Sequence, residues 1–78
     1  MRKQEDKTVM TFYTTAAAMR CEQLCRENDL PGRLFPAPRS MTADCGIAWQ
    51  SPAEWKDRLL ETAQRNGLEY EQCLILRI

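Results

Sequence analysis

The stretch that decides the fold reads Thr8-Val9-Met10-Thr11-Phe12-Tyr13-Thr14-Thr15-Ala16-Ala17-Ala18. Its first six residues are β-branched, apolar or aromatic, and no glycine or proline interrupts them, which is typical of a strand. Thr14 or Thr15 then offers a hydroxyl that can cap a helix. Helix formers continue from Ala16 to Asn28, and the apolar side chains share one face: Ala17, Cys21, Leu24 and Cys25. The chain therefore opens with a strand that leads into an amphipathic helix.

Two short strands are expected next. Leu30-Pro31-Gly32 stops the helix, and Arg33-Leu34-Phe35 reads as a second strand that Pro36 ends. Ile47-Ala48-Trp49 reads as a brief third strand. The connection between them, residues 36–46, is longer than the usual two to five or so residues of a β-hairpin, and length of this kind is often functional.

The second helix has a distinct start signal in Ser51-Pro52-Ala53-Glu54. This stretch combines a hydroxyl at the N-cap, a proline at the first helical position and a glutamate three residues after the serine. We expect the helix to run to about Asn66, with Trp55 on its apolar face and Gly67 as its left-handed cap. Residues 68–78 then form the last strand.

The order strand, helix, strand, strand, helix, strand predicts an α+β, ferredoxin-like sandwich with an antiparallel sheet and two helices on one face. We assign residues 8–78 to this single domain and residues 1–7 to a disordered polar tail. The first strand carries apolar side chains on both faces, with Met10 and Phe12 on one face and Val9 on the other. An exposed second face would be a natural homodimer surface.

Composition narrows the function classes. Eleven basic and eleven acidic residues among 78 give a net charge of zero, so neither nucleic acid nor an anionic membrane is an expected partner. The chain contains no histidine, which removes the commonest general base and argues against a stand-alone enzyme. No signal-peptide core follows the polar start and no run of roughly 20 apolar residues occurs, so we expect a cytoplasmic protein.

The four cysteines are expected to be free thiols in a reducing cytoplasm. Cys21 and Cys25 are four residues apart on a helix, too far for an unstrained disulfide. Only these two approach metal-ligand spacing, so we expect no metal site and no cofactor. Cys21, Cys25 and Cys73 are read as small buried apolar residues.

Reactive chemistry is concentrated in one loop, Phe35-Pro36-Ala37-Pro38-Arg39-Ser40-Met41-Thr42-Ala43-Asp44-Cys45-Gly46. The prolines fix the path of the backbone, Arg39 supplies a permanent positive charge, and Cys45 is followed at once by a glycine that lets the backbone approach closely. A cysteine near positive charge or converging N–H groups is a better nucleophile, whereas Asp44 opposes that effect. The alternative roles are an unreactive loop thiol for Cys45 and a surface ion pair for Arg39.

With these residues the chain resembles the family of selenium or sulfur carrier-like proteins from about Val9 to Ile78. The features that carry the resemblance are Phe12, the Thr-Thr-Ala-Ala-Ala helix entry, Phe35-Pro36-Ala37-Pro38-Arg39, Thr42 and Cys45-Gly46. The resemblance implies a ferredoxin-like fold and a carrier that holds sulfur or selenium on Cys45 as a persulfide or selenylsulfide. Its implied partners are a cysteine desulfurase or another persulfide or selenium donor, and an acceptor enzyme.

A second function class stays open, namely a non-catalytic ferredoxin-like interaction module that dimerises through its open sheet face. Its loop would bind a protein or a small anion without covalent chemistry. Substitution of Cys45 by serine separates the two, because it abolishes the carrier and leaves a binding module intact.

Overall fold

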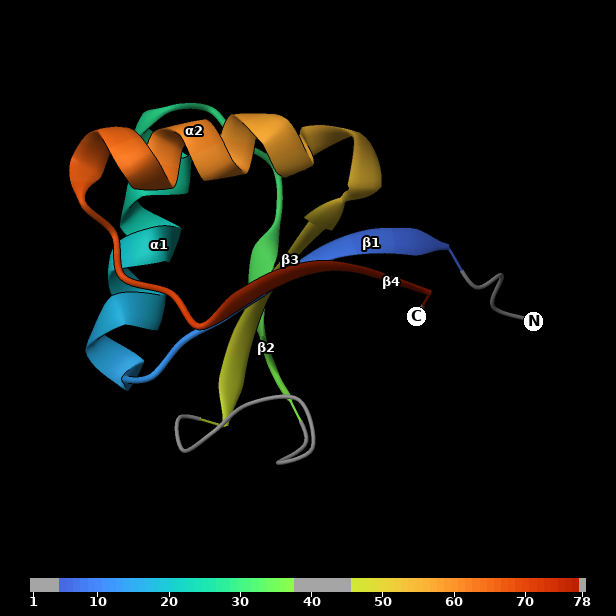
Figure 1. The fold of residues 1–78 in the computed structure, drawn as a ribbon, viewed down its shortest axis with the longest axis horizontal. Coiled ribbons are helices and arrows are strands. Elements are labelled where there is room, and N and C mark those ends of the chain that lie inside the picture. The colour runs from blue at the N-terminus through green and yellow to red at the C-terminus, as the bar shows by residue number, and fades with distance from the viewer. Residues whose placement is uncertain (1–4, 38–45, 78) are drawn as a thin grey trace.

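The computed structural model describes residues 5–37 and 46–77, which form a four-stranded antiparallel sheet and two helices (Figure 1). The elements in chain order are β1 (Asp6–Thr11), α1 (Thr15–Glu27), β2 (Arg33–Pro36), β3 (Ile47–Pro52), a 3₁₀ turn (Ala53–Trp55), α2 (Lys56–Asn66) and β4 (Gln72–Arg77). The strand order is β2-β3-β1-β4, so β1 and β3 are central and β2 and β4 form the edges. The prediction of an α+β domain with an antiparallel sheet and two helices is confirmed.

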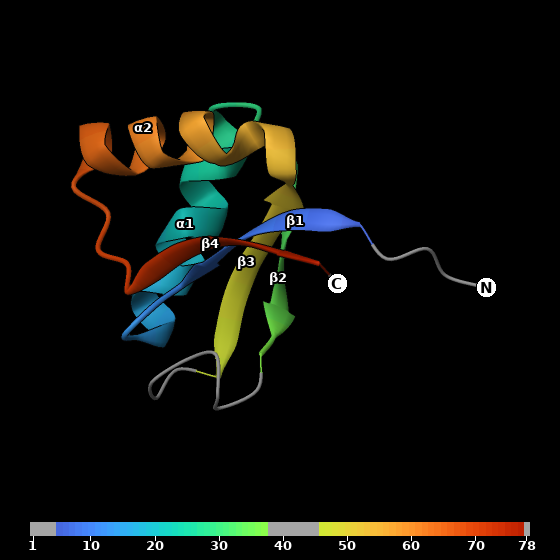
Figure 2. The same cartoon turned by 45° about the vertical axis from the view of Figure 1, so that its right-hand side comes forward.

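Both helices pack on the same side of the sheet (Figures 1 and 2). Directly opposed residues of neighbouring strands share a face, and Met10 is opposed to Trp49 on β3 and to Cys73 on β4. Met10 and Trp49 belong to the buried core together with apolar residues of both helices, including Leu24 and Leu59. The core therefore lies between the helices and this face of the sheet.

The other face of β1 is covered as well. Val9 and Ala48 are fully buried although they alternate with residues that face the helices. Val9 is opposed to Gln50 and Leu74, whose longer side chains flank it on the same face. The expectation that the first strand is apolar on both faces is confirmed, but the second face is not open at its centre. Dimerisation stays a prediction.

Helix α1 forms as predicted. Thr14 is the N-cap and its side chain accepts a hydrogen bond from the Ala17 N–H at 3.1 Å. At the other end, the Asn28 side-chain amide donates to the Leu24 carbonyl at 2.8 Å. The buried residues are Ala18, Cys21, Leu24 and Cys25, so Ala18 is fully buried whereas Ala17 is only half-buried.

The predicted start of the second helix is wrong. Ser51 and Pro52 continue β3, and Ser51 is opposed to Thr8 of β1. The 3₁₀ turn and then α2 follow, and the side chain of Trp55, the N-cap of α2, makes no capping hydrogen bond to the described residues. Pairing with β1 extends β3 by three residues beyond the predicted end at Trp49, because the ladder satisfies backbone groups that a helix start would leave free.

Strand boundaries also differ from the sequence prediction. Asp6 and Lys7, assigned to the polar tail, belong to β1, where Asp6 forms an ion pair of 3.4 Å with Arg77 on β4. Strand β4 begins at Gln72, four residues later than predicted, whereas Leu68 is buried before the strand begins. The left-handed cap at Gly67 is confirmed, with φ of 63° and its N–H directed to the Ala63 and Gln64 carbonyls.

Candidate functional site

The candidate site lies where β2 ends and β3 begins. Pro36 is opposed to Ile47 as the last pair of the β2–β3 ladder, and the Ala37 N–H donates to the Gly46 carbonyl at 3.0 Å. These contacts hold the two ends of the long connection together. Arg39 and Cys45, the other two predicted site residues, lie outside the described residues, and so does Asp44.

Gly46 adopts φ of +73°, in the left-handed region that favours glycine. A Cβ built on Gly46 meets no atom of the described residues within 4 Å. Glycine is therefore favoured at this position by the left-handed backbone conformation and not by a lack of space for a side chain. It fixes the direction in which the chain enters β3 immediately after Cys45.

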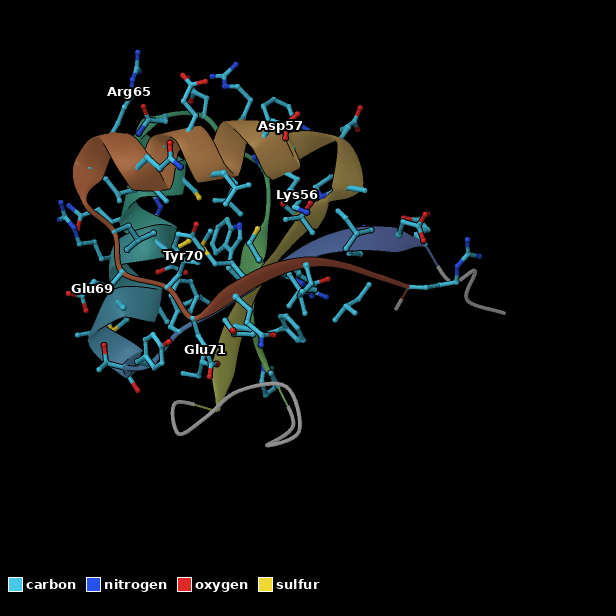
Figure 3. The ribbon with its side chains drawn as sticks, in the orientation of Figure 1. Lys56, Asp57, Arg65, Glu69, Tyr70 and Glu71 are labelled. Atoms are coloured by element: carbon cyan, nitrogen blue, oxygen red, sulfur yellow. The ribbon has the colours of Figure 1, made fainter. Side chains whose placement is uncertain are left out.

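A hydrogen-bonded group at the same end of the sheet was missed by sequence reasoning. The Thr11 hydroxyl donates to the Glu71 carboxylate at 3.2 Å and accepts from the Gln72 N–H at 3.1 Å. The Glu71 N–H also donates to the Thr11 carbonyl at 2.7 Å. Figure 3 shows the Glu71 side chain directed toward the end of the sheet where β3 begins. No local motif predicts this group, because Thr11 and Glu71 are 60 residues apart.

Cys21 and Cys25 form a buried thiol pair on α1. Their Sγ atoms are 4.0 Å apart, and the side chains are 0% and 1% exposed. The contact with Cys25, together with burial, raises the pKa of Cys21 far above its ordinary value. The same contact lowers the pKa of Cys25, against the effect of burial. Neither thiol is accessible, so the reading of both as buried small residues is confirmed.

Cys73 is a half-buried free thiol on β4. Burial raises its pKa, and the positive charge of Lys56 offsets part of that increase. Figure 3 shows Lys56 extending from the start of α2 toward the sheet, whereas Asp57 points away from it. Cys73 therefore lacks the low pKa of an activated nucleophile.

Residues 5–37 and 46–77 contain neither a cluster of metal-ligand side chains nor a membrane-spanning helix. Within these ranges no group of three or more His, Cys, Asp or Glu side chains is placed to hold a metal ion. Neither helix in the same ranges is long and apolar enough to cross a membrane.

A family model matches the chain over most of its length. The model of the family described as "Putative Se/S carrier protein-like" matches residues 7–75, which is nearly the whole chain. The chain belongs to this family of selenium or sulfur carrier-like proteins. No curated protein and no solved structure matches it.

Proposed function

We propose that this protein carries sulfur or selenium on Cys45, as a persulfide or selenylsulfide, and transfers it to an acceptor enzyme. Family membership over residues 7–75 is the observation that carries the proposal. It is a carrier role and not that of a stand-alone enzyme. We further propose that it acts in the cytoplasm, with a cysteine desulfurase or another persulfide or selenium donor as its first partner.

The environments of the other cysteines support the choice of Cys45. Cys21 and Cys25 are inaccessible, and Cys73 is half-buried with a raised pKa. A carrier thiol must reach the active sites of two partners and must react as a thiolate. Cys45 comes immediately before Gly46, at the edge of a connection whose ends are held by the hydrogen bond between Ala37 and Gly46.

The transfer consists of two thiol-exchange steps. The Cys45 thiolate attacks the outer sulfur of the donor persulfide, a new S–S bond forms to Cys45, and the donor leaves as its thiolate. An acceptor nucleophile then attacks the same outer sulfur, and Cys45 leaves as a thiolate. In this proposal Arg39 stabilises the thiolate, and Gly46 allows the backbone to approach the outer sulfur closely.

The fold that we propose for this role is the ferredoxin-like sandwich. Read from the other edge, the strand order is β4-β1-β3-β2, so each β-α-β unit places its second strand at an edge. Both helices lie on one face, as in a split β-α-β arrangement (Figure 2). An experimental structure with another strand order would contradict this assignment.

Intact mass spectrometry tests the carrier directly. The reduced protein is incubated with a cysteine desulfurase and cysteine, or with selenocysteine for the selenium arm, and its mass is measured with and without reductant. We expect a gain of one chalcogen atom that reductant removes. The gain should be absent from Cys45→Ser and retained by Cys73→Ser, the matched control for a half-buried thiol. A folded wild-type protein that stays unmodified with several donors would overturn the proposal.

A further inference from the structure

A pocket of about 230 Å³ lies between the C-terminal half of α1 and the start of β2. It is lined by residues 30–33 together with Glu22, Arg26 and Trp49. Arg33, at the start of β2, lines it, whereas Ala37 and Gly46 lie beyond the other end of this strand. The pocket is therefore separate from the candidate carrier site.

Trp49, one of the residues that line the pocket, carries a buried hydrogen-bond donor without a partner among the described residues. Trp49 is 3% exposed, and its Nε1 atom has no hydrogen-bond partner among the described residues. A Cβ built on Gly32 would lie 2.8 Å from Trp49 Cε2, the ring atom bonded to Nε1. The indole N–H thus lies close to Gly32, which lines the pocket. A buried donor left unpaired destabilises the folded state, so an acceptor at this position would stabilise the protein.

The charges around the pocket favour an anion. Arg26 and Arg33 contribute two positive charges and Glu22 one negative charge, so the lining carries a net charge of one positive unit. Arg26 pairs with Glu22 at 3.7 Å, a long contact between side chains that are 77% and 40% exposed, which holds Arg26 only weakly. Arg33 has no ion pair within residues 5–37 and 46–77.

We propose that this pocket binds a small anion, an oxyanion or a carboxylate, through the guanidinium groups of Arg26 and Arg33 and the indole N–H of Trp49. Guanidinium groups bind such anions through charge-assisted hydrogen bonds. The volume is several times the roughly 30 Å³ that a water molecule occupies in the liquid, so phosphate or a short carboxylic acid fits. Because Nε1 has less than 1 Å² of accessible surface, binding includes a small displacement of the residues over the indole.

Nuclear magnetic resonance provides a specific test, because Trp49 and Trp55 each give one indole N–H signal and Trp55 does not line the pocket. The ¹⁵N-labelled protein is titrated with sodium phosphate, sulfate, acetate or citrate at constant ionic strength, and Trp55→Phe assigns the two signals. We expect a saturable shift of the Trp49 signal with a dissociation constant on the order of 1 mM, while the Trp55 signal stays in place. Comparing the affinities for phosphate and sulfate with those for acetate and citrate distinguishes the two anion classes. Failure of every anion to give a saturable shift, or equal shifts of both indoles, would overturn the proposal.

Matched variants separate a binding site from general charge screening. Arg33→Gln should weaken binding about tenfold, the effect of losing one charge-assisted hydrogen bond. Glu22→Gln should strengthen binding, because it removes the carboxylate that competes for Arg26. Arg65→Gln, on the last turn of α2 and pointing away from the sheet in Figure 3, is the control and should leave affinity unchanged. Equal effects of the Arg33 and Arg65 changes would show that only screening is measured. These results do not depend on Cys45, so the carrier proposal is tested separately.

Discussion

Ser51 lies directly opposite Thr8 in the antiparallel ladder between β3 and β1. The Thr8 hydroxyl lies within hydrogen-bond distance of the Pro52 and Ala53 carbonyls, at 3.4 and 3.3 Å, and the Ser51 hydroxyl is buried with no partner among the described residues. A serine that resembles a helix cap in the sequence is therefore a strand residue. Its hydroxyl caps no N–H group of the turn or helix that follows.

We expect Ser51→Ala to leave stability unchanged or to increase it by up to about 1 kcal/mol, because it removes an unpaired buried hydroxyl. Thr14→Ala should cost about 1 kcal/mol, since Thr14 is a true N-cap. Urea unfolding of both variants measures the difference. A decrease in the free energy of unfolding for Ser51→Ala as large as that for Thr14→Ala would contradict the structure.

Substitution of two glycines by alanine should give unequal losses. Gly32→Ala places a Cβ against the Gln50 carbonyl oxygen and 2.7 Å from the Trp49 ring, so the backbone must move. We expect a loss of stability of about 3 kcal/mol or more. At Gly67 the added Cβ meets no atom of the described residues within 4 Å, so Gly67→Ala should lose only about 1 kcal/mol of stability, the cost of placing alanine in the left-handed conformation. Thermal unfolding ranks the two, and a reversed order would exclude the described path of residues 31–33.

Thr11→Val should cost about 1–2 kcal/mol, because it leaves the Gln72 N–H without its hydroxyl acceptor and breaks the bond to Glu71. Thr62→Val is the matched control, since the Thr62 hydroxyl donates to the Arg58 carbonyl within its own helix. Hydrogen exchange at Gln72 should accelerate in the Thr11 variant alone. Unchanged exchange at Gln72 would show that the hydroxyl does not tie β4 to β1.

Alkylation of Cys73 should rise with pH through a midpoint above the ordinary thiol value, because burial raises its pKa. Lys56→Gln should move the midpoint still higher, whereas Asp57→Asn, whose side chain points away, should not. Since the folded pKa is raised, the contribution of Cys73 to stability is complete below the unfolded pKa, near 9, and is lost as pH rises through the folded pKa. Iodoacetamide labelling followed by mass spectrometry measures the midpoint pH of alkylation. A midpoint at or below that of a free cysteine would contradict the described burial of Cys73.

Elements with local sequence signals could be predicted without the structure. The α1 helix with its Thr14 cap and the left-handed end of α2 at Gly67 depend on hydrogen bonds between residues only a few positions apart. The local residue types therefore predict both features. The loop motif likewise pointed to Cys45 and Gly46, of which the structure describes Gly46.

The positions of β3 and β4 along the chain follow from tertiary contacts and not from local signals, because strand pairing joins residues that are distant in sequence. Ser51 and Pro52 fit a helix start locally, yet the ladder with Thr8 and Lys7 extends β3 through them. The hydrogen bond between Thr11 and Glu71 arises in the same way, and so does the indole N–H of Trp49 that has no partner among the described residues. Each depends on which backbone and side-chain groups the packed sheet brings together, and that choice is made by burial and long-range hydrogen bonding and not by local propensity.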